Sequence, residues 1–463
     1  MTKSSLYQAQ PPLEFIPPTL NPTFLRIAQV GIPLWMRLMT SIVQVEAENV
    51  EILTDLYRQF EAGKIRFMLA FRHPKVEDPV CLGYMLSQIV PKVAKQEAKS
   101  GLPKLNKPVH CHFIYDRGVP LWAGSHIGWI AQNLGGTPIQ RGKADWTGLR
   151  SARDLFANGE FPMAAAPEGA TNGLTEIVNP LEPGIAQFGF WCVEDLHKAG
   201  RNQEVLIVPV GIKYYYLDAP WHKIADLLTE LGTACGMATS STNQPPSLES
   251  LYPRLVTFAD HLLGIMENFY TKFYHRDLPK SQETSDKNLE LATRLQTLLD
   301  VILQVAEEYF DLQPKGNLND RCRRVEQAGW NYIFRDDFRD IKSLSPLEKG
   351  LGDRIAEEAN LRMWHMRLVE NFVAVTGTYI REKPSFERFA EMTLIFWEMV
   401  TCILGQETGL KTPHLGKQQA KITIGQPLSV SQRYPAYKAN RLSARQAVAD
   451  LTQDLQVSLE KLI

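Results

Sequence analysis

The sequence predicts an α/β fold in which a mostly parallel sheet is flanked by helices and interrupted by a large all-helical insertion. Short continuous apolar runs, such as residues 65–71 and 204–216, suit strands that are buried on both faces. These runs alternate with helical patterns in the first half of the chain, which favours parallel strands joined by helices. The strand signal stops after Tyr216 and returns only at residues 420–430.

The elements of the first half follow from their hydrophobic periodicity. Residues 1–22 are rich in proline and are expected to be extended, whereas residues 24–62 have a helical pattern that ends near Gly63. Strands are expected at residues 65–71, 109–115, 161–169 and 204–216, with a short extended segment at 137–141. Helices are expected at residues 80–99, 121–134, 146–158 and 184–200.

The second half contains long amphipathic helical patterns over residues 222–410, and a last helix is expected at 445–463. The isolated strand at 420–430 needs partners for its backbone groups, so we expect it to join the sheet of the first half. The expected domains are an N-terminal extension (1–45), an α/β core (46–220 and 419–463) and a helical insertion (221–418).

Composition limits the class of partner and the compartment. The 463-residue chain has a formal net charge of −1, so it lacks a global positive field and no nucleic-acid partner is expected. Its six cysteines are far apart and form no C-x-x-C, which argues against a zinc site or a disulfide framework. Residues 1–20 lack the apolar core of a signal peptide. A cytoplasmic protein is therefore expected.

Residues 24–45 are the best candidate for a membrane contact. Two arginines, two glutamines and a proline interrupt them, whereas a spanning helix needs roughly 20 mostly apolar residues, so no crossing is expected. Two alternatives stay open, namely a core-packing helix pair and a helix that lies in the membrane interface. In the second, the lipid-facing residues would be Phe24, Leu25, Trp35, Leu38 and Met39.

The stretch F-R-H-P-K-V-E-D-P places Asp78 five positions after His73, with Pro74 between them. On one regular helix the two side chains would diverge by roughly 140°, so they meet only if His73 lies before the helix. Pro74 favours that geometry because it suits a first helical turn and moves the preceding residue out of α conformation. A carboxylate on one imidazole nitrogen lets the other accept a proton, which predicts a general base. Helix capping by the pair is the alternative.

Three further stretches follow in order along the chain. Arg141 comes after the turn G-G-T-P-I-Q, Glu168 and Gly169 lie where a strand becomes a loop, and Pro209 lies in the strand I-V-P-V-G-I. Together with the H-x4-D motif, this order resembles the glycerophospholipid acyltransferase family, which includes lysophosphatidate and glycerol-3-phosphate acyltransferases.

The resemblance covers about residues 65–216 and 420–463, and it implies a reaction of phospholipid synthesis. A fatty acyl group would pass from a thioester donor, acyl-CoA or acyl carrier protein, to a hydroxyl of a glycerol-phosphate or lysophospholipid acceptor. His73 would deprotonate that hydroxyl and Asp78 would orient His73. No metal or other cofactor is implied. A lysolipid acceptor partitions into bilayers, so peripheral association with a membrane surface is expected.

The resemblance also implies a set of substrate-binding residues. Arg141 would hold the acceptor's phosphate, and a guanidinium is suited to this because it can donate two parallel hydrogen bonds. Glu168 and Gly169 would belong to the acceptor-binding loop, and Pro209 would belong to the fourth motif of the family.

The sequence departs from the family pattern in two motifs. Arg72 stands where a polar residue usually precedes the histidine, and Lys75 stands where a serine usually follows it. The third motif continues as A-T-N at residues 170–172 in place of threonine and arginine, which removes one expected phosphate contact. Lys143 or Lys75 is the candidate to supply that charge, and an ordinary surface lysine is the alternative for each.

Other chemistries have weaker support. The chain has no G-x-S-x-G nucleophile motif and lacks the glycine spacing of a P-loop. His110 and His112 alternate on a strand near Asp116, but packed histidines are favoured over a metal site because further ligands are missing nearby. Two alternatives to phosphate-acceptor acylation stay open. One is transfer to a long-chain alcohol without phosphate, and the other is a catalytically degenerate fold that binds lipid or protein.

Overall fold

The computed structural model describes residues 7–140, 145–238, 244–278, 286–370, 372–373, 375–405 and 412–463. Within these residues the chain forms two compact units. The α/β unit is built from residues 15–140, 145–218 and 416–463, and the helical unit from residues 7–14 and the described part of 219–415. Residues 15–45 therefore contribute to the α/β unit instead of forming a separate extension.

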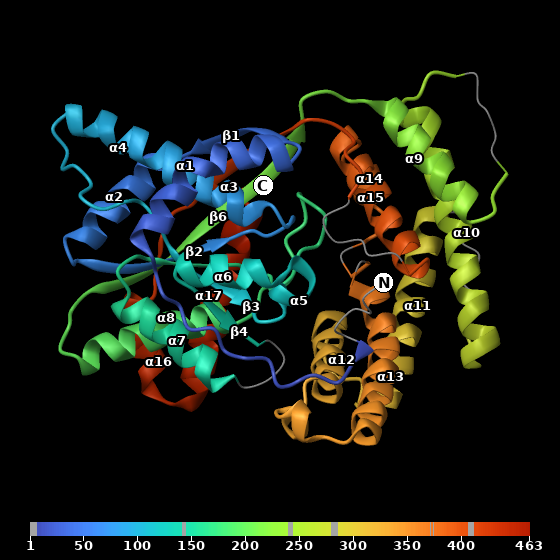
Figure 1. The fold of residues 1–463 in the computed structure, drawn as a ribbon. Coiled ribbons are helices and arrows are strands. Elements are labelled where there is room, and N and C mark those ends of the chain that lie inside the picture. Colours follow the sequence, from blue (N-terminus) through green and yellow to red (C-terminus); the bar gives the residue numbers. More distant parts are fainter. Residues whose placement is uncertain are drawn as a thin grey trace. The chain divides into compact units, whose positions relative to one another are not determined.

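The described residues of the α/β unit form an open, mostly parallel sheet of eight strands (Figure 1). The strands are β1 (Ile42–Glu48), β2 (Ile65–Phe71), β3 (His112–Asp116), β4 (Gly136–Ile139), β5 (Met163–Ala165), β6 (Glu204–Tyr216), β7 (Gln418–Ile424) and β8 (Leu428–Ser429). Their order is β1-β7-β6-β2-β5-β3-β4, with β8 beside β6. The strands from β6 to β4 are parallel, whereas β7 and β8 run antiparallel to β6. The predicted α/β class with a mostly parallel sheet is confirmed.

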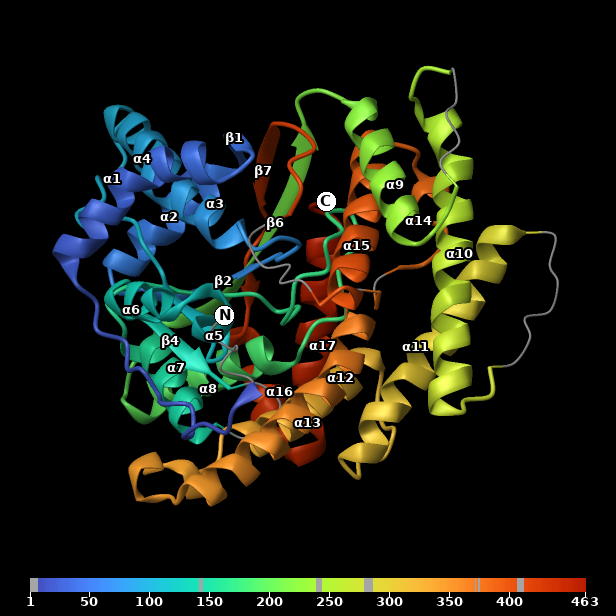
Figure 2. The ribbon, with the colours of Figure 1, turned by 45° about the vertical axis from the view of Figure 1, so that its right-hand side comes forward.

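Helices cover both faces of this sheet, as Figures 1 and 2 show. One face packs against α2, α3 and α4, and the other against α7, α8 and α17. The helices of the unit are α1 (Pro22–Met39), α2 (Val50–Glu61), α3 (Asp78–Tyr84), α4 (Val90–Lys99), α5 (Val119–Ala123), α6 (Ser125–Asn133), α7 (Trp146–Asn158), α8 (Gly184–Lys198), α16 (Tyr434–Ala439) and α17 (Arg441–Glu460). A π-helical turn, Met85–Ile89, joins α3 to α4.

The central strand β2 shows why its sequence is a continuous apolar run. Phe67, Leu69 and Phe71 pack in the core on one face, and Met68 and Ala70 pack in the core on the other. Every residue of β2 is buried. A strand with helices on both faces has no solvent side, so the usual alternation of apolar and polar residues disappears.

The helix expected over residues 24–62 is wrong in its middle, where β1 separates α1 from α2. The β1 sequence I-V-Q-V-E-A-E alternates apolar and polar residues, which suits a half-exposed edge strand. Asn49 then starts the turn into α2 with a φ of 58°, a conformation that asparagine tolerates. Pairing with β7 stabilises β1, and β7 lies far away in the sequence.

The strand β7 lies between β1 and β6 in the sheet, so it links the first strand of the unit to a strand more than 150 residues later. It pairs with β1 in parallel and with β6 antiparallel, where Val210 lies opposite Ile424 and Tyr216 opposite Gln418. The Leu217 N–H donates to the Lys417 carbonyl at 3.0 Å, so the chain leaves and re-enters the sheet at neighbouring positions. Residues 219–415 are thus inserted between two adjacent antiparallel strands.

The helical unit contains long helices with defined caps. Its helices are α9 (Trp221–Ala234), α10 (Leu248–Tyr274), α11 (Lys287–Tyr309), α12 (Leu318–Ile333), α13 (Pro346–Glu370), α14 (Tyr379–Glu382) and α15 (Phe386–Ile403), with 3₁₀ turns at Asp336–Phe338 and Ile341–Ser343. Ser247 and Asn317 form capping boxes at α10 and α12. None of the helices in the described part of the chain has both the length and the apolarity that crossing a membrane requires.

Candidate functional site

The candidate site lies at the carboxyl edge of the parallel strands. His73 follows β2 by two residues, and Glu168 follows β5 by three. Because β2 and β5 are parallel neighbours, the two segments leave the sheet at the same edge. In open α/β sheets, ligands bind in crevices at this edge.

His73 and Asp78 meet at the start of α3. The Nδ1 of His73 lies 3.1 Å from Oδ2 of Asp78. His73 precedes the helix and Asp78 is its first residue, as expected, but Pro74 lies before the helix and Pro79 is the proline of its first turn. The same Oδ2 accepts the Lys75 backbone N–H at 2.7 Å. The contact expected from the sequence is therefore present.

The geometry fixes the roles of the two imidazole nitrogens. The Asp78 side chain is fully buried, whereas the His73 side chain keeps 23% of its surface exposed. A buried carboxylate favours a proton on the Nδ1 that faces it, which leaves the lone pair on Nε2. An imidazole held in this tautomer can accept a proton from a bound hydroxyl group.

Tyr214 is a member of this cluster that the sequence analysis missed. Its hydroxyl donates to Oδ1 of Asp78, the oxygen that faces away from His73. Burial, together with the negative charge of Asp78, raises the pKa of Tyr214 well above its ordinary value, so the hydroxyl keeps its proton. The signal was available in Y-Y-Y of β6, because strand alternation places Tyr214 on the same buried face as Val210 and Ile212.

Lys75 extends the cluster toward β7. Its Nζ donates to Oε1 of Gln418 at 2.9 Å and lies 4.4 Å from the centre of the Tyr214 ring. A lysine in this position carries a positive charge beside the His73–Asp78 pair. Lys75 therefore remains the described candidate for the phosphate contact that the third motif lacks.

The Glu168 side chain is buried and binds the backbone of the site. Its Oε1 accepts the His73 N–H at 3.0 Å, and its Oε2 accepts the Asn179 N–H at 2.9 Å. The carboxylate thereby ties the loop after β2 to the loop after β5. Glu168 acts on His73 through the backbone, and its side chain does not face solvent.

Arg72 is buried opposite His73 and holds the same loop. Side chains alternate between the two faces along β2 and just beyond it. Arg72 therefore lies on the same face as Ala70, and His73 lies on the same face as Phe71. Its Nε lies 3.4 Å from Oε1 of Glu168. Its guanidinium also donates to the carbonyls of Leu174 (2.9 Å), Thr175 and Ile177. Arg72, one of the residues that depart from the pattern of the resembled family, therefore holds the loop after β5 in place from inside the fold.

The loop after β5 folds back on the H-x4-D segment. Gly169 has a φ of 73°, which a residue with a Cβ rarely adopts. The Gly173 N–H donates to the Pro74 carbonyl at 3.1 Å. The Asn172 amide donates to the Ile177 carbonyl at 2.7 Å, so this residue of the A-T-N sequence closes the loop on itself.

Pro209 lies inside β6, apart from the cluster around Asp78. It is buried, and its carbonyl accepts the Gly425 N–H at 2.8 Å. A Cβ on Gly425 would lie 2.7 Å from Cγ of Pro209, so only glycine fits there. Gly425 directly follows β7, and a proline without an N–H suits a point where the neighbouring ladder is interrupted.

Arg141 and Lys143 lie outside the described residues. Next to them along the chain, Asp145 accepts the N–H of Gln140 at 2.9 Å and that of Gly148 at 3.2 Å. Arg117 pairs with the same carboxylate.

The strand histidines are structural. His110 Nε2 lies 2.8 Å from the Leu134 carbonyl, and His112 Nδ1 lies 3.0 Å from the Gly135 carbonyl. Burial lowers the pKa of His110 to about 4 and also lowers that of His112. Among the residues that the structure describes, no group of three or more His, Cys, Asp or Glu side chains could hold a metal ion.

Comparison with models of known protein families gives no match, and no curated protein matches the chain in sequence. The chemistry of the site is therefore inferred from its residues. It combines a partly exposed imidazole, a buried carboxylate that orients it, and two loops that leave the sheet at one edge. This arrangement can remove a proton from a ligand bound at the carboxyl ends of β2 and β5.

Proposed function

We propose that this chain is an O-acyltransferase that moves a fatty acyl group from a thioester to a hydroxyl of a glycerol-phosphate or lysophospholipid acceptor. The observation that supports it is the 3.1 Å contact between His73 Nδ1 and Asp78 Oδ2 at the edge of the sheet. The reaction class comes from the order of the four sequence motifs, which resembles that of glycerophospholipid acyltransferases. On this proposal the α/β unit is a glycerolipid acyltransferase fold that carries residues 219–415 as an insertion.

The proposed reaction uses one base and no cofactor. His73 Nε2 takes the proton of the acceptor hydroxyl as its oxygen bonds to the thioester carbonyl carbon. The tetrahedral intermediate then expels the thiolate, which breaks the C–S bond, and His73 returns the proton to sulfur. Asp78 stabilises the imidazolium that exists between these steps. General base catalysis of this kind is worth about 10²–10⁴-fold in rate.

A lysophospholipid acceptor is amphipathic, and α1 offers a surface for the bilayer that would hold it. Of the residues expected on the lipid side, Leu25 is buried, and Phe24 is half-buried and packs edge-on against Trp129. The other three expected residues, Trp35, Leu38 and Met39, are exposed, and they form a stripe with Ile27, Val30 and Leu34. We propose that this stripe mediates peripheral membrane association on the cytoplasmic side.

A labelled acyl-thioester assay tests the proposal. Acyl-CoA and acyl carrier protein donors are supplied in parallel to glycerol 3-phosphate, lysophosphatidate, another lysophospholipid and a long-chain alcohol. Ester formed on a phosphate acceptor supports the proposal, and ester formed on the alcohol alone assigns a different acceptor. Binding of lipid without transfer from either donor would contradict the proposed reaction and favour a degenerate lipid-binding fold.

A further inference from the structure

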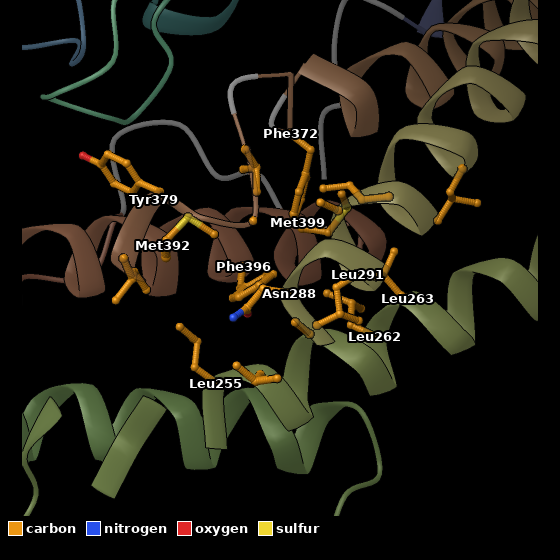
Figure 3. A pocket seen from close by; sticks show the side chains of 18 of the residues that line it. Leu255, Leu262, Leu263, Asn288, Leu291, Phe372, Tyr379, Met392, Phe396 and Met399 are labelled. Atoms are coloured by element: carbon orange, nitrogen blue, oxygen red, sulfur yellow. The ribbon is translucent and has the colours of Figure 1, made fainter. Parts of the chain in front are cut away.

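The helical unit contains an apolar pocket between α10, α11 and α15 (Figure 3). Its empty volume is about 850 Å³, which includes the space at its open mouth. Leu255 and Leu262 point into it from α10, Leu291 from α11, and Met392 and Phe396 from α15. Mainly apolar walls with a few polar groups are typical of small-molecule sites.

The chemistry of the walls limits the ligand. Among the described residues that line the pocket there is no Lys, Arg, His, Asp or Glu. Polar side chains of the lining are hydrogen-bonded within the protein. The Tyr252 hydroxyl donates to Asn288 at 3.1 Å, and the Tyr379 hydroxyl donates to Glu391 at 2.6 Å. A phosphate or nucleotide would find no counter-charge here. The walls suit a hydrocarbon.

The shape of the pocket favours a chain over a compact molecule. Its lining residues on α10 run from Tyr252 to Met266, which corresponds to about 21 Å along the helix axis. The lining residues on α11 run from Asn288 to Leu299, about 16 Å. An opening that follows two helices over several turns has the proportions of an extended long-chain alkyl group.

The side chains around the pocket indicate a built site. Cores pack with few voids larger than a water molecule, and empty cavities destabilise a fold. The same helices pack tightly elsewhere, where Phe258, Tyr270 and Leu303 are almost fully buried. Met266, Met392 and Met399 line the pocket, and unbranched thioether side chains adapt to ligands of varied shape.

We propose that the helical unit binds one long, unbranched hydrocarbon chain in this pocket, with the polar end of the ligand at the mouth. The ligand class is a neutral lipid or the alkyl tail of a larger one. The site belongs to the helical unit alone, and it stands whether or not His73 catalyses acyl transfer.

Binding of primary alcohols to the full, delipidated chain tests the proposal. Octanol, decanol, dodecanol and tetradecanol should each bind in a 1:1 complex that raises the thermal midpoint. Burial of each added methylene should tighten binding by about fourfold until the pocket is full. Absence of saturable binding, or affinity that does not depend on chain length, would overturn the proposal.

Two variants locate the binding. Ala259→Phe and Val256→Phe each place a ring in the pocket from α10, and Ile265→Phe adds a ring on the exposed side of the same helix. Each pocket variant should weaken tetradecanol binding by about tenfold or more, because the ring displaces two or more methylenes. Ile265→Phe should bind as the wild type does.

Tetradecanol affinity that is equal in a folded pocket variant and in Ile265→Phe would place the ligand elsewhere and refute the assignment. Either pocket variant is sufficient for this comparison. If neither variant folds, the alcohol series decides. A pocket of fixed length stops gaining affinity once the alkyl chain fills it. An open surface such as the exposed stripe of α1 has no end wall, so affinity would keep rising with each added methylene.

Discussion

The carboxylate of Asp78 receives hydrogen bonds from three parts of the chain. The imidazole of His73, the backbone of Lys75 and the hydroxyl of Tyr214 all point to it. A buried polar group is costly unless it is hydrogen-bonded, and these three donors satisfy both oxygens of the buried Asp78 carboxylate. At the scale of residues, the orientation of His73 is therefore set by Asp78, which the Lys75 backbone and the Tyr214 hydroxyl hold in place.

The first prediction concerns the base itself. His73→Ala should lower the rate of acyl transfer by about 10²–10⁴-fold or more, because it removes the proton acceptor. Asp78→Asn should have a similar or milder effect, since it disturbs the tautomer and leaves the imidazole in place. Steady-state rates, with circular dichroism as the check on folding, measure both. A folded His73→Ala protein with near-normal turnover would disprove the mechanism.

The second prediction concerns Tyr214 as a positioning residue. Tyr214→Phe removes a hydrogen bond to a buried charge, which is worth about 1.5–3 kcal/mol, so kcat should fall by about tenfold or more. Both KM values should change by no more than about twofold, because Tyr214 touches Asp78 and not the substrate.

Tyr215→Phe is the matched control for this variant. Tyr215 is the next residue of β6 and lies on the opposite face of the sheet, where its ring contacts Lys213. Its kcat should equal that of the wild type. Equal losses in the two variants would mean that the tyrosines matter only for packing.

The third prediction concerns pH and a buried histidine of the helical unit. Burial, with the charge of Arg362 added, lowers the pKa of His365 to about 3, and its Nδ1 lies 2.7 Å from the Tyr270 hydroxyl. The unfolded chain takes up a proton at this residue near pH 6.5, and the folded chain does not. Stability therefore falls as the pH falls from about 6.5 toward 3, by about 2 kcal/mol at pH 5 for this residue.

Thermal midpoints at pH 7 and pH 5 measure this effect. His365→Gln should lose less stability on acidification than the wild type, whereas His222→Gln, a change at an exposed residue, should match the wild type. His110 is present in all three proteins, so its contribution cancels. An acid-induced loss that is unchanged in His365→Gln would contradict the prediction.

At the scale of elements, α1 is an amphipathic helix with only one face covered. Leu25 and Met36 are buried against the α/β unit, whereas Val30 is 80% exposed and Leu38 is 70% exposed. Asn21 caps the helix by accepting two backbone N–H groups. A contiguous apolar stripe that remains exposed on a stable helix marks an interaction surface, and Arg26 and Arg37 beside it suit anionic headgroups.

The fourth prediction tests this stripe with liposomes that contain anionic lipid. The wild type should float with the vesicles, and a Leu34→Glu, Leu38→Glu double variant should remain unbound, because burial of two charges in the interface opposes insertion. Leu442→Glu, at an equally exposed leucine of α17, is the control and should float. Flotation of the double variant would show that another surface binds the membrane.

At the scale of the whole molecule, the connection between β6 and β7 explains how two units share one chain. The Leu217 N–H and the Lys417 carbonyl are hydrogen-bonded at 3.0 Å, so about two hundred residues begin and end at adjacent points of one antiparallel pair. An insertion at such a point leaves the register of the sheet unchanged. All the described strands of the sheet therefore belong to the α/β unit, and none comes from the helical unit.

The fifth prediction follows from this connection. A chain that starts at residue 15 and joins residue 218 to 416 through a short Gly/Asn loop should be soluble and should unfold cooperatively, because the loop converts β6 and β7 into a simple hairpin. A chain that ends at residue 417 should be insoluble, since the loss of β7 leaves β1 without its partner strand and exposes one edge of β6. Solubility, gel filtration and thermal melts compare them. The reverse result would show that β7 is dispensable.

The sequence by itself determined those features that depend on neighbouring residues. The apolar runs of β2 and β6 predicted buried parallel strands because burial on both faces leaves a continuous hydrophobic pattern. The contact between His73 and Asp78 was predictable because Pro74 restricts the backbone over a few residues. The need of a lone strand for partners likewise predicted that residues 420–430 join the sheet.

The tertiary structure decided what depends on residues far apart. Residues 42–48 alternate in a way that suits a strand, but the stretch is short and adjoins helical patterns on both sides, and pairing with the distant β7 decides its structure. Tyr214 reaches Asp78 across 136 positions, and Arg72 reaches Glu168 across 96. The order of strands in the sheet determines which distant residues become neighbours. Buried polar groups then hydrogen-bond to the neighbours they find, so these pairs form only when the strands assemble.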